Sequence, residues 1–429
     1  MNTKIIAIIL LLVAGIGVTL FSVTSDVSTK NEYEGYVEKA QINADNDIPY
    51  VAATNFKKAF AIETPSEEIF LTYLEQMKKL GEDYELIALE EYLQMYPMSS
   101  NAYLLNLQRL YEQESYVKVV ELALEAKEKE IATQEIKDYY TNAYYKYKYL
   151  RVGFEEAQSF IGNYALVKLG GLYGYLTGEG DYLIAPMYKD ASIFLGSTAA
   201  VDDGNGYYMI NAYGFKVAIT SGPLDYMSCI LNNKILAGKD GKFGYLSSDL
   251  VVPEAFAYDN ATNFKNNVAA VCQNGKWALI SSDNTNITDF IFEDVIRDEY
   301  NTCINNGVIF AKSDGAYYMY DATGKKISEL AFEDACAFVG AQPAAVKIDG
   351  KWGFVNAKGE IVIEAKYENA GSYCCNLAPV CENGLWKYVD NEGVVRIEGD
   401  FAEAKPFSAN GVAAIKEGEI WNYIKLVTF

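Results

Sequence analysis

The chain has 429 residues, with 58 acidic side chains, 36 lysines and arginines and seven cysteines. Half of the residues are apolar, which is enough to build sizeable cores. The net charge of −22 excludes a nucleic-acid-binding protein of the usual kind, which needs a basic face. The chain has no histidine, which excludes every catalytic triad and metal site built on that residue.

The N-terminus contains an uncharged apolar stretch at residues 5–23 (IIAIILLLVAGIGVTLFSV). A helix rises about 1.5 Å per residue, so this stretch matches a hydrocarbon core of about 30 Å. The sequence favours an uncleaved transmembrane anchor at residues 1–24, with a cleaved signal peptide or a buried helix as alternatives. Lys4 precedes the stretch and acidic residues follow it, so we expect a single-pass protein of the cell membrane with the bulk of the chain extracytoplasmic.

We interpret residues 25–50 as an acidic linker and residues 51–163 as helical repeats, because apolar residues recur there at spacings of three and four. The predicted helices are Glu67–Leu80, Tyr84–Met95, Asn101–Gln113, a helix from Tyr116, Gln134–Leu150 and Phe154–Phe160. Stacked helix pairs form concave faces, so this part is expected to be a docking surface.

The helical spacing resembles that of tetratricopeptide repeats, which have a period near 34 residues. The residues at the packing positions of that motif are Leu104, Leu107, Tyr111, Val120 and Leu124, preceded by Tyr84, Ala88, Tyr92 and Pro97. The match is degenerate, since Gln108 stands where the motif usually has glycine. An irregular helical bundle is the alternative.

Residues 164–429 follow a different pattern, in which tight turns separate short apolar strands. Asn-Gly or Asp-Gly dipeptides recur at 203–204, 240–241, 274–275, 314–315, 349–350 and 383–384, with Gly170-Gly171 before them and Glu417-Gly418 after them. A type I′ turn needs positive φ at both central residues, so these dipeptides predict β-hairpins.

An aromatic residue follows each of these turns, and we call this set the repeat aromatics. They are Tyr173, Tyr207, Phe243, Trp277, Tyr317, Trp352, Trp386 and Trp421. The steps between them are 34, 36, 34, 40, 35, 34 and 35 residues, and all four tryptophans of the chain occupy this position. The spacing indicates a β repeat whose aromatics form the core between units.

One unit shows the repeat most clearly, as Asp349-Gly350-Lys351-Trp352-Gly353-Phe354-Val355 followed by two further short segments. This unit resembles a WG repeat, a family named for its Trp-Gly pair and found in many bacterial proteins, often at the cell surface. Only Trp352-Gly353 keeps the pair intact, while Tyr173-Gly174 and Phe243-Gly244 keep the glycine.

Three or four strands in about 35 residues is the size of a propeller blade. The fold class is therefore multidomain α plus all-β: a helical-repeat stalk followed by a β-propeller of seven to eight blades, with an open β array as the alternative. Seven complete units are followed by one lone hairpin at residues 412–424. We favour a closed ring, because closure hides strand edges that would otherwise aggregate.

Candidate sites for chemistry are weak throughout. We expect no catalytic, cofactor-binding or metal-binding residue, and no cofactor. The Glu-Asp or Glu-Asn pairs at 293–294, 333–334 and 368–369 repeat in register, which favours a structural role, and Asp202-Asp203-Gly204 lacks the spaced ligands of a calcium loop. The aromatics Tyr182, Tyr188, Tyr208, Tyr245, Tyr318 and Tyr388 are candidates for a ligand groove.

These features predict a non-enzymatic, membrane-anchored and outward-facing scaffold that binds protein partners through its repeats. Its expected partners are a protein, the membrane through the N-terminal helix, and a cell-wall glycan, with no nucleic acid. The alternative functions are a cell-envelope glycan-binding protein and a hydrolase that uses carboxylates alone.

Overall fold

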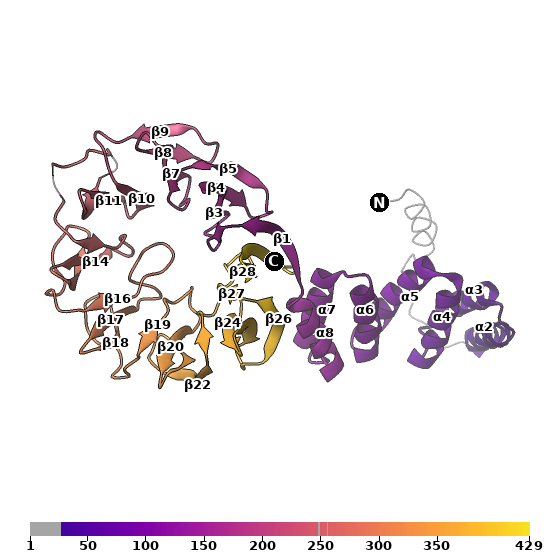
Figure 1. Ribbon diagram of the computed structural model, residues 1–429. Helices are drawn as coiled ribbons and strands as arrows, with labels where there is room; N and C mark the ends of the chain where they lie inside the picture. Colours follow the sequence, from indigo (N-terminus) through magenta and orange to yellow (C-terminus); the bar gives the residue numbers. More distant parts are fainter. Residues whose placement is uncertain (1–26, 248, 255) are drawn as a thin grey trace. The chain divides into compact units, whose positions relative to one another are not determined.

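The computed structural model describes residues 27–247, 249–254 and 256–429. The chain divides into two compact units, Met1–Thr141 and Asn142–Phe429. Helices make up the described part of the first unit, and small antiparallel sheets make up most of the second (Figure 1).

The described residues contain seven helices. They are α2 (Val27–Asp45), α3 (Pro49–Phe60), α4 (Glu67–Leu80), α5 (Glu82–Met95), α6 (Ser100–Glu112), α7 (Tyr116–Glu128) and α8 (Gln134–Tyr144). Local chemistry sets their ends: Ser66 Oγ accepts from the Ile69 amide at the start of α4, and Ser99 Oγ accepts from the Ala102 amide at the start of α6. A core cluster runs through α2 to α6, and in it Phe70 is fully buried and packs against Tyr73 and Tyr92.

Three details of the predicted helical region differ from the structure. Residues 27–45 of the expected acidic linker form the helix α2. This helix packs through small side chains such as the buried Ala40, and small side chains give only a weak apolar pattern in the sequence. The last helix ends at Tyr144, and residues 154–160 contribute to strands rather than a helix. At the predicted packing positions, Ala88, Tyr92 and Leu107 are buried, whereas Tyr84 and Leu124 are exposed.

No helix within the described ranges is long and apolar enough to span a membrane. The longest of them, α2, carries charged side chains along its length, such as Lys30 and Glu38. This finding overturns the predicted location as a single-pass membrane protein with its bulk outside the cell. The apolar stretch at 5–23, on which that prediction and the anchor at 1–24 rested, lies outside the described residues.

The second unit is a β-propeller of eight blades, each a small antiparallel sheet. Blade 1 consists of β2 (Glu156–Ala157), β3 (Tyr164–Leu169), β4 (Leu172–Thr177) and β5 (Tyr182–Tyr188). Blade 2 consists of β6 (Asp190–Ala191), β7 (Thr198–Asp202), β8 (Tyr207–Asn211) and β9 (Lys216–Ile219). Blade 3 consists of β10 (Tyr226–Leu231), β11 (Lys234–Lys239) and β12 (Lys242–Leu246). Blades 4 and 5 hold β13 (Asn260–Ala261), β14 (Val268–Gln273) and β15 (Lys276–Ser281), and β16 (Asp294–Val295), β17 (Ile309–Ser313) and β18 (Ala316–Tyr320).

Blade 6 consists of β19 (Asp334–Ala335), β20 (Ala344–Ile348), β21 (Lys351–Val355) and β22 (Ile361–Tyr367). Blade 7 consists of β23 (Asn369–Ala370), β24 (Leu377–Glu382), β25 (Leu385–Asp390) and β26 (Val395–Phe401). Blade 8 combines β27 (Glu403–Ala404), β28 (Val412–Glu417) and β29 (Ile420–Leu426) with β1 (Tyr147–Phe154) from the other end of the unit. The predicted propeller is therefore confirmed, with eight blades.

Strand β1 closes the ring by pairing antiparallel with β29, from Tyr147 opposite Leu426 to Phe154 opposite Trp421. The lone C-terminal hairpin is completed in this way, and its outer edge is covered. A second closing contact is the Tyr423 hydroxyl, which is fully buried and donates to the Gln158 carbonyl of blade 1 at 2.6 Å.

Removing only this hydroxyl, in Tyr423→Phe, should lower the free energy of unfolding by about 1–2 kcal/mol, because the change withdraws a donor from a buried carbonyl. Urea denaturation measures the loss. The matched control is Tyr213→Phe, whose ring is 83% exposed and which should change stability by less than about 0.5 kcal/mol. Equal stability of the two variants would contradict a closing role for Tyr423.

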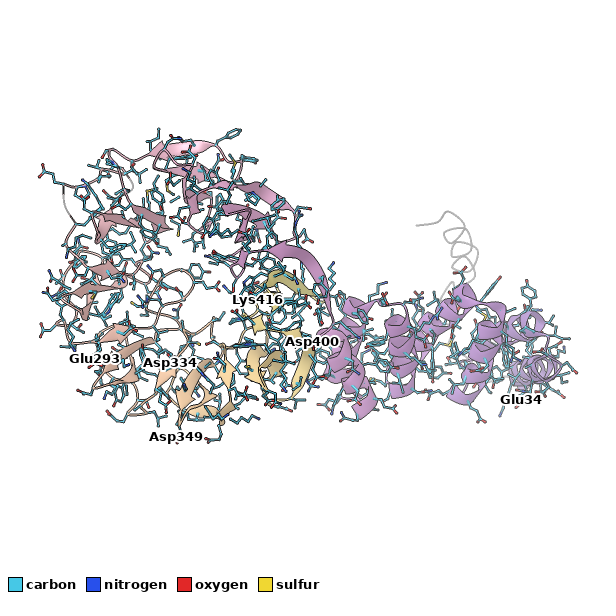
Figure 2. The ribbon with its side chains drawn as sticks, viewed as in Figure 1. Glu34, Glu293, Asp334, Asp349, Asp400 and Lys416 are labelled. Carbon is cyan, nitrogen blue, oxygen red and sulfur yellow. The ribbon has the colours of Figure 1, made fainter. Side chains whose placement is uncertain are left out.

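The hairpin turns have the predicted conformation in most blades. Both central residues have positive φ at 170–171, 240–241, 274–275, 314–315, 349–350 and 383–384. Blades 2 and 8 are the exceptions: β7 and β8 are joined by the four residues 203–206, and between β28 and β29 only Gly418 has positive φ. Figure 2 shows Asp349, from the turn of blade 6, at the edge of the ring in this view.

Candidate interaction surfaces

The repeat aromatics lie in the interfaces between blades, as predicted. Trp277 packs with Val295 and Ile309 of blade 5, and Trp352 packs with Ala370 and Val380 of blade 7. All eight of them belong to or border a cluster that joins their own blade to the next one around the ring. Tyr207, Trp277, Tyr317 and Trp352 are buried and the other four are half-buried, so the set packs between blades.

The second set of aromatics does not form a groove. Tyr188, Tyr208 and Tyr388 are buried, and Tyr182, Tyr245 and Tyr318 are half-buried. Two of them hold neighbouring blades together: the hydroxyl of Tyr388 donates to the Lys405 carbonyl at 2.9 Å, and that of Tyr245 donates to the Thr262 carbonyl at 2.8 Å. Burial raises the pKa of Tyr388 well above its ordinary value.

The repeated acidic residues bind the hairpin turns. Carboxylates accept from turn amides in the pairs Glu155–Gly170, Glu293–Gly315, Glu333–Gly350 and Glu368–Gly384. Asp203 similarly accepts from the Asn205 backbone and side chain within its own loop, and these bonds lower the pKa of Asp203. Within the described residues, no group of three or more Cys, Asp and Glu side chains is arranged to hold a metal ion.

An exposed apolar surface lies on the last strand of blade 2. We call it the β9 patch and define it as Tyr213, Phe215, Val217 and Ile219. These side chains are 83%, 69%, 51% and 65% exposed. Residues 215, 217 and 219 alternate along the strand and so share one face, since successive side chains of a strand point to opposite faces.

The turn before β9 holds the two aromatic rings in place. Asn211 Oδ1 accepts from the amides of Tyr213 and Phe215 at 3.0 Å each, and Gly214 adopts φ 77° between them. The ring centroids of Tyr213 and Phe215 are 6.3 Å apart. The patch is thus built on a hydrogen-bonded turn and a strand.

The β9 patch differs from the outer strands of other blades. The exposed face of β22 carries Glu364 and Lys366, that of β26 carries Glu398, and β5 contains Pro186. Charges and proline are the usual protection of an edge strand against pairing with another chain. Lys216 lies between the patch residues but its Nζ is 3.5 Å from the centroid of the Tyr208 ring. The exposed face of β9 is therefore apolar.

A second candidate lies at the centre of the ring, where one connection is much longer than its counterparts. We call residues 296–308, between β16 and β17, the central loop; the equivalent connections at 158–163, 192–197, 262–267 and 371–376 are shorter. Asp298 shapes it by accepting from the amides of Tyr300 (3.0 Å) and Thr302 (2.7 Å). Figure 1 shows the loop after β16 reaching into the ring.

The central loop is bonded to blades on both sides of the channel. Asn263 of blade 4 donates its amide to the Asn301 carbonyl and its Nδ2 to the Tyr300 carbonyl, at 2.6 and 2.7 Å. Glu299 accepts from the Ser159 amide of blade 1 at 2.8 Å and from Lys405 Nζ of blade 8 at 3.0 Å. In a ring of eight, blade 1 lies opposite blade 5, so the loop crosses the channel.

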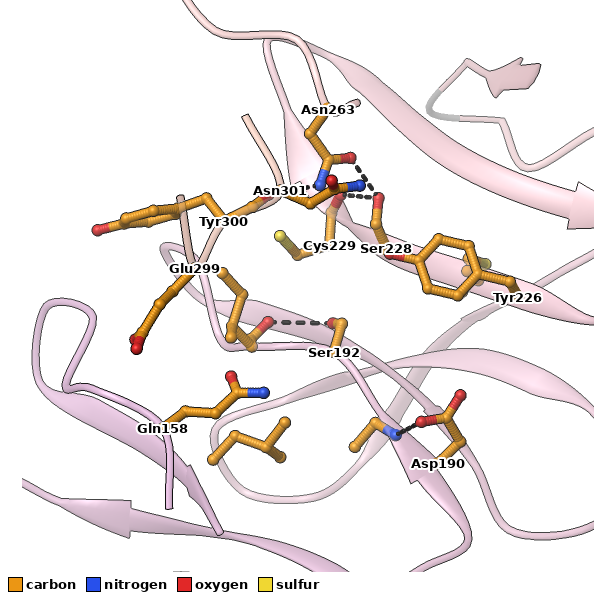
Figure 3. A pocket seen from close by; sticks show the side chains of 14 residues that line it. Gln158, Asp190, Ser192, Tyr226, Ser228, Cys229, Asn263, Glu299, Tyr300 and Asn301 are labelled. Atoms are coloured by element: carbon orange, nitrogen blue, oxygen red, sulfur yellow. Dashed lines mark hydrogen bonds between the residues drawn. The ribbon is translucent and has the colours of Figure 1, made fainter. Parts of the chain in front are cut away.

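A pocket of about 190 Å³ lies beside the central loop. Its lining residues come from blades 1 to 4 and the loop, and Figure 3 shows those with polar side chains: Gln158, Asp190, Ser192, Tyr226, Ser228, Asn263, Glu299, Tyr300 and Asn301. The other lining residues include Leu166, Ile193, Met227 and Cys229. We call it the central pocket.

Two ionisable groups of the central pocket, Cys229 and Tyr226, have raised pKa values. Burial raises the pKa of the Cys229 thiol to about 12, and burial together with Cys229 and Asp190 raises the pKa of Tyr226 to about 12. Both groups are therefore neutral at physiological pH. All seven cysteines are free thiols, and five of them, including Cys229, are buried.

The sequence analysis did not identify the central pocket. Four of its lining residues, Gln158, Ser192, Ser228 and Asn263, recur at steps of 34, 36 and 35 residues, but the residue type changes from unit to unit, so the repeat pattern did not single them out. One signal was present: the step of 40 residues from Trp277 to Tyr317 is longer than all the others, and the excess falls in the central loop.

Comparison with known families adds a direct test of the repeat. The family described as "WG containing repeat" matches residues 153–173, 255–277, 352–386 and 388–421. Each match ends on a repeat aromatic, and the third runs from Trp352 of blade 6 to Trp386 of blade 7. A segment that matches this family therefore spans parts of two neighbouring blades, while blades 2 and 5 lie outside the matched segments.

No curated protein matches the sequence. Among solved structures, the chain is similar to a eukaryotic initiation factor (TM-score 0.38, 11% identity, covering 63% of this chain and 85% of that one). It is also similar to the N-terminal domain of Nup159 (TM-score 0.31, 10% identity, covering 65% and 95%). Similarity at this level carries no inference about function.

Proposed function

We propose that this protein is a non-enzymatic scaffold that binds a protein partner on its propeller, with the β9 patch as the docking edge. The observation that carries the proposal is the exposed row of Phe215, Val217 and Ile219 at a strand that ends its sheet. Exposed apolar surface on an unprotected edge is typical of binding sites.

The occupant we assign is an extended segment of a basic partner protein, added as a strand beside β9. The free edge supplies backbone hydrogen bonds, and the alternating apolar side chains supply the contacts for a strand of matching pattern. The net charge of −22 disfavours a second copy of this chain and favours a partner of opposite charge.

The test uses the full chain and a synthetic ten-residue peptide of alternating lysine and valine. We expect it to bind, and we expect the double variant Phe215→Ser with Val217→Lys to weaken binding at least tenfold with an unchanged melting temperature, because both positions are exposed. Val362→Lys, on the exposed face of β22, is the matched control and should bind as wild type.

Three outcomes would overturn the proposal. The peptide binds the double variant as tightly as wild type, or a soluble glycan binds at Tyr213 and the peptide does not, or wild type self-associates in sedimentation and the double variant does not. The last two results would assign the β9 patch to a glycan or to a second copy of the chain.

The helical unit is proposed as a second docking surface of the tetratricopeptide type. What supports this is the succession of helices of 11 to 14 residues from α3 to α8, with short connections and a core that runs through neighbouring helices. Its partner is not assigned.

A further inference from the structure

We propose that the central pocket binds a small organic cation with N–H donors, a primary ammonium or guanidinium group. This site is separate from the β9 patch and goes beyond the scaffold role. Its volume of about 190 Å³ far exceeds the about 10–15 Å³ that one water molecule needs, so a compact ligand fits.

The first observation is an acceptor without a donor. The side-chain oxygen Oε1 of Gln158 is buried and has no hydrogen-bond partner among the described residues. A buried polar atom in this state destabilises the fold, and a ligand N–H would supply the missing hydrogen bond. Figure 3 shows the Gln158 amide beside the lining residues of blade 2.

The second observation is the charge of the lining. The fourteen lining residues include Asp190 and Glu299 and neither lysine nor arginine. Glu299 is paired with Lys405, whereas Asp190 is bonded by neutral groups, the Ala191 amide at 2.9 Å and the Tyr207 hydroxyl. The charge of Asp190 is therefore left to attract a cation in a setting of lower dielectric than water.

The third observation is the neutral and aromatic character of the remaining wall. Tyr226 and Tyr300 both line the pocket, and aromatic faces attract ammonium and guanidinium groups. Lys265 Nζ already lies 5.3 Å from the centroid of the Tyr300 ring, so Tyr226 is the ring left for a ligand cation. Tyr300 is held by the central loop, since its carbonyl accepts from Asn263. The loop, which no other blade has at this length, thus supplies one side of the site.

The test is calorimetric titration of the full chain with n-butylguanidinium, n-butylammonium and the uncharged n-butylurea. We expect at least one cation to bind at least tenfold more tightly than the urea. An arginine-containing tripeptide, Gly-Arg-Gly, forms a further arm: tighter binding than n-butylguanidinium would identify a peptide side chain as the source, and weaker binding a free small cation.

Two variants and one control locate the site. Gln158→Met should weaken cation binding at least tenfold without lowering the melting temperature, because the Gln158 side-chain oxygen makes no protein hydrogen bond. Asp190→Asn should weaken cation binding at least fivefold and leave n-butylurea unchanged. Gln273→Met, at an exposed hairpin end, is the matched control and should bind as wild type.

Equal affinity for n-butylurea and both cations would overturn the assignment of charge. Failure of all three probes to bind at millimolar concentration, or unchanged binding in both variants, would overturn the site itself. The β9 double variant should bind the cation as wild type does, so failure of one proposal is distinguishable from failure of the other.

Discussion

Replacing Trp352 by alanine should lower the free energy of unfolding by about 3–5 kcal/mol, the usual cost of removing a large aromatic side chain from a core. Trp352 is 8% exposed and packs in a cluster with Tyr367 of its own blade and Ala370 and Val380 of blade 7. The cavity would open between two blades, where neither sheet can relax without moving the other.

Urea denaturation followed by far-ultraviolet circular dichroism measures this loss. The control is Leu385→Ala, which removes an apolar side chain of the neighbouring hairpin that is 46% exposed and should cost less than about 1 kcal/mol. A stable Trp352→Ala protein that has lost only partner binding would place the repeat aromatics on a ligand surface, contrary to the packing.

The repeat part of the fold was predictable because it depends on local chemistry. An Asn-Gly or Asp-Gly pair favours positive φ at both residues whatever surrounds it, so the pairs Asn274-Gly275 and Asn383-Gly384 predict their hairpins from the local sequence alone. The aromatic after each turn packs at the equivalent position between blades. Its regular spacing in the sequence therefore reflects the length of one blade.

The closure of the ring was not predictable from local pattern. Strand β1 finds its partner β29 about 270 residues later, and nothing in Tyr147–Phe154 alone distinguishes a closing strand from the helical residues before it. The acidic residues at the turns were predictable in part. Their regular spacing could be seen in the sequence, but the turn amides that they bind could not.

The candidate surfaces were hidden for opposite reasons. The β9 patch consists of apolar residues that a strand pattern assigns to the core, and only the position of β9 at the end of its sheet exposes them. The central pocket depends on residues such as Gln158 and Asp190 from different blades, brought together by closure and by one long loop.

Gly353→Ala, in the single intact Trp-Gly pair, should lower the free energy of unfolding by about 3 kcal/mol, at the upper end of the usual cost of overpacking. A Cβ on Gly353 would lie 2.6 Å from the Ile363 carbonyl oxygen and 2.7 Å from the Ala365 amide nitrogen. Both are backbone atoms of β22, so no side chain can turn aside to make room.

The need for glycine follows from the register of the two strands. Between the pairs Trp352–Tyr367 and Phe354–Ile363, β22 has two residues more than β21, so its backbone bulges toward Gly353. Gly174 of blade 1 meets the same contact, 2.5 Å from the Pro186 nitrogen. At both positions glycine is thus required by the bulge of the neighbouring strand, and not by its own φ.

Gly178→Ala is the control for this prediction, because a Cβ there would lie 3.9 Å from its nearest neighbour and should change stability by less than about 0.5 kcal/mol. Blade 7 has the same bulge but no glycine facing it, because Lys387 stands at the position of Gly353. There the bulged strand β26 itself contains a glycine, Gly399. Urea denaturation of Gly353→Ala beside Gly178→Ala separates steric conflict from the general effect of losing a glycine. If both variants unfold at the same urea concentration, the bulge is not what selects glycine in the pair.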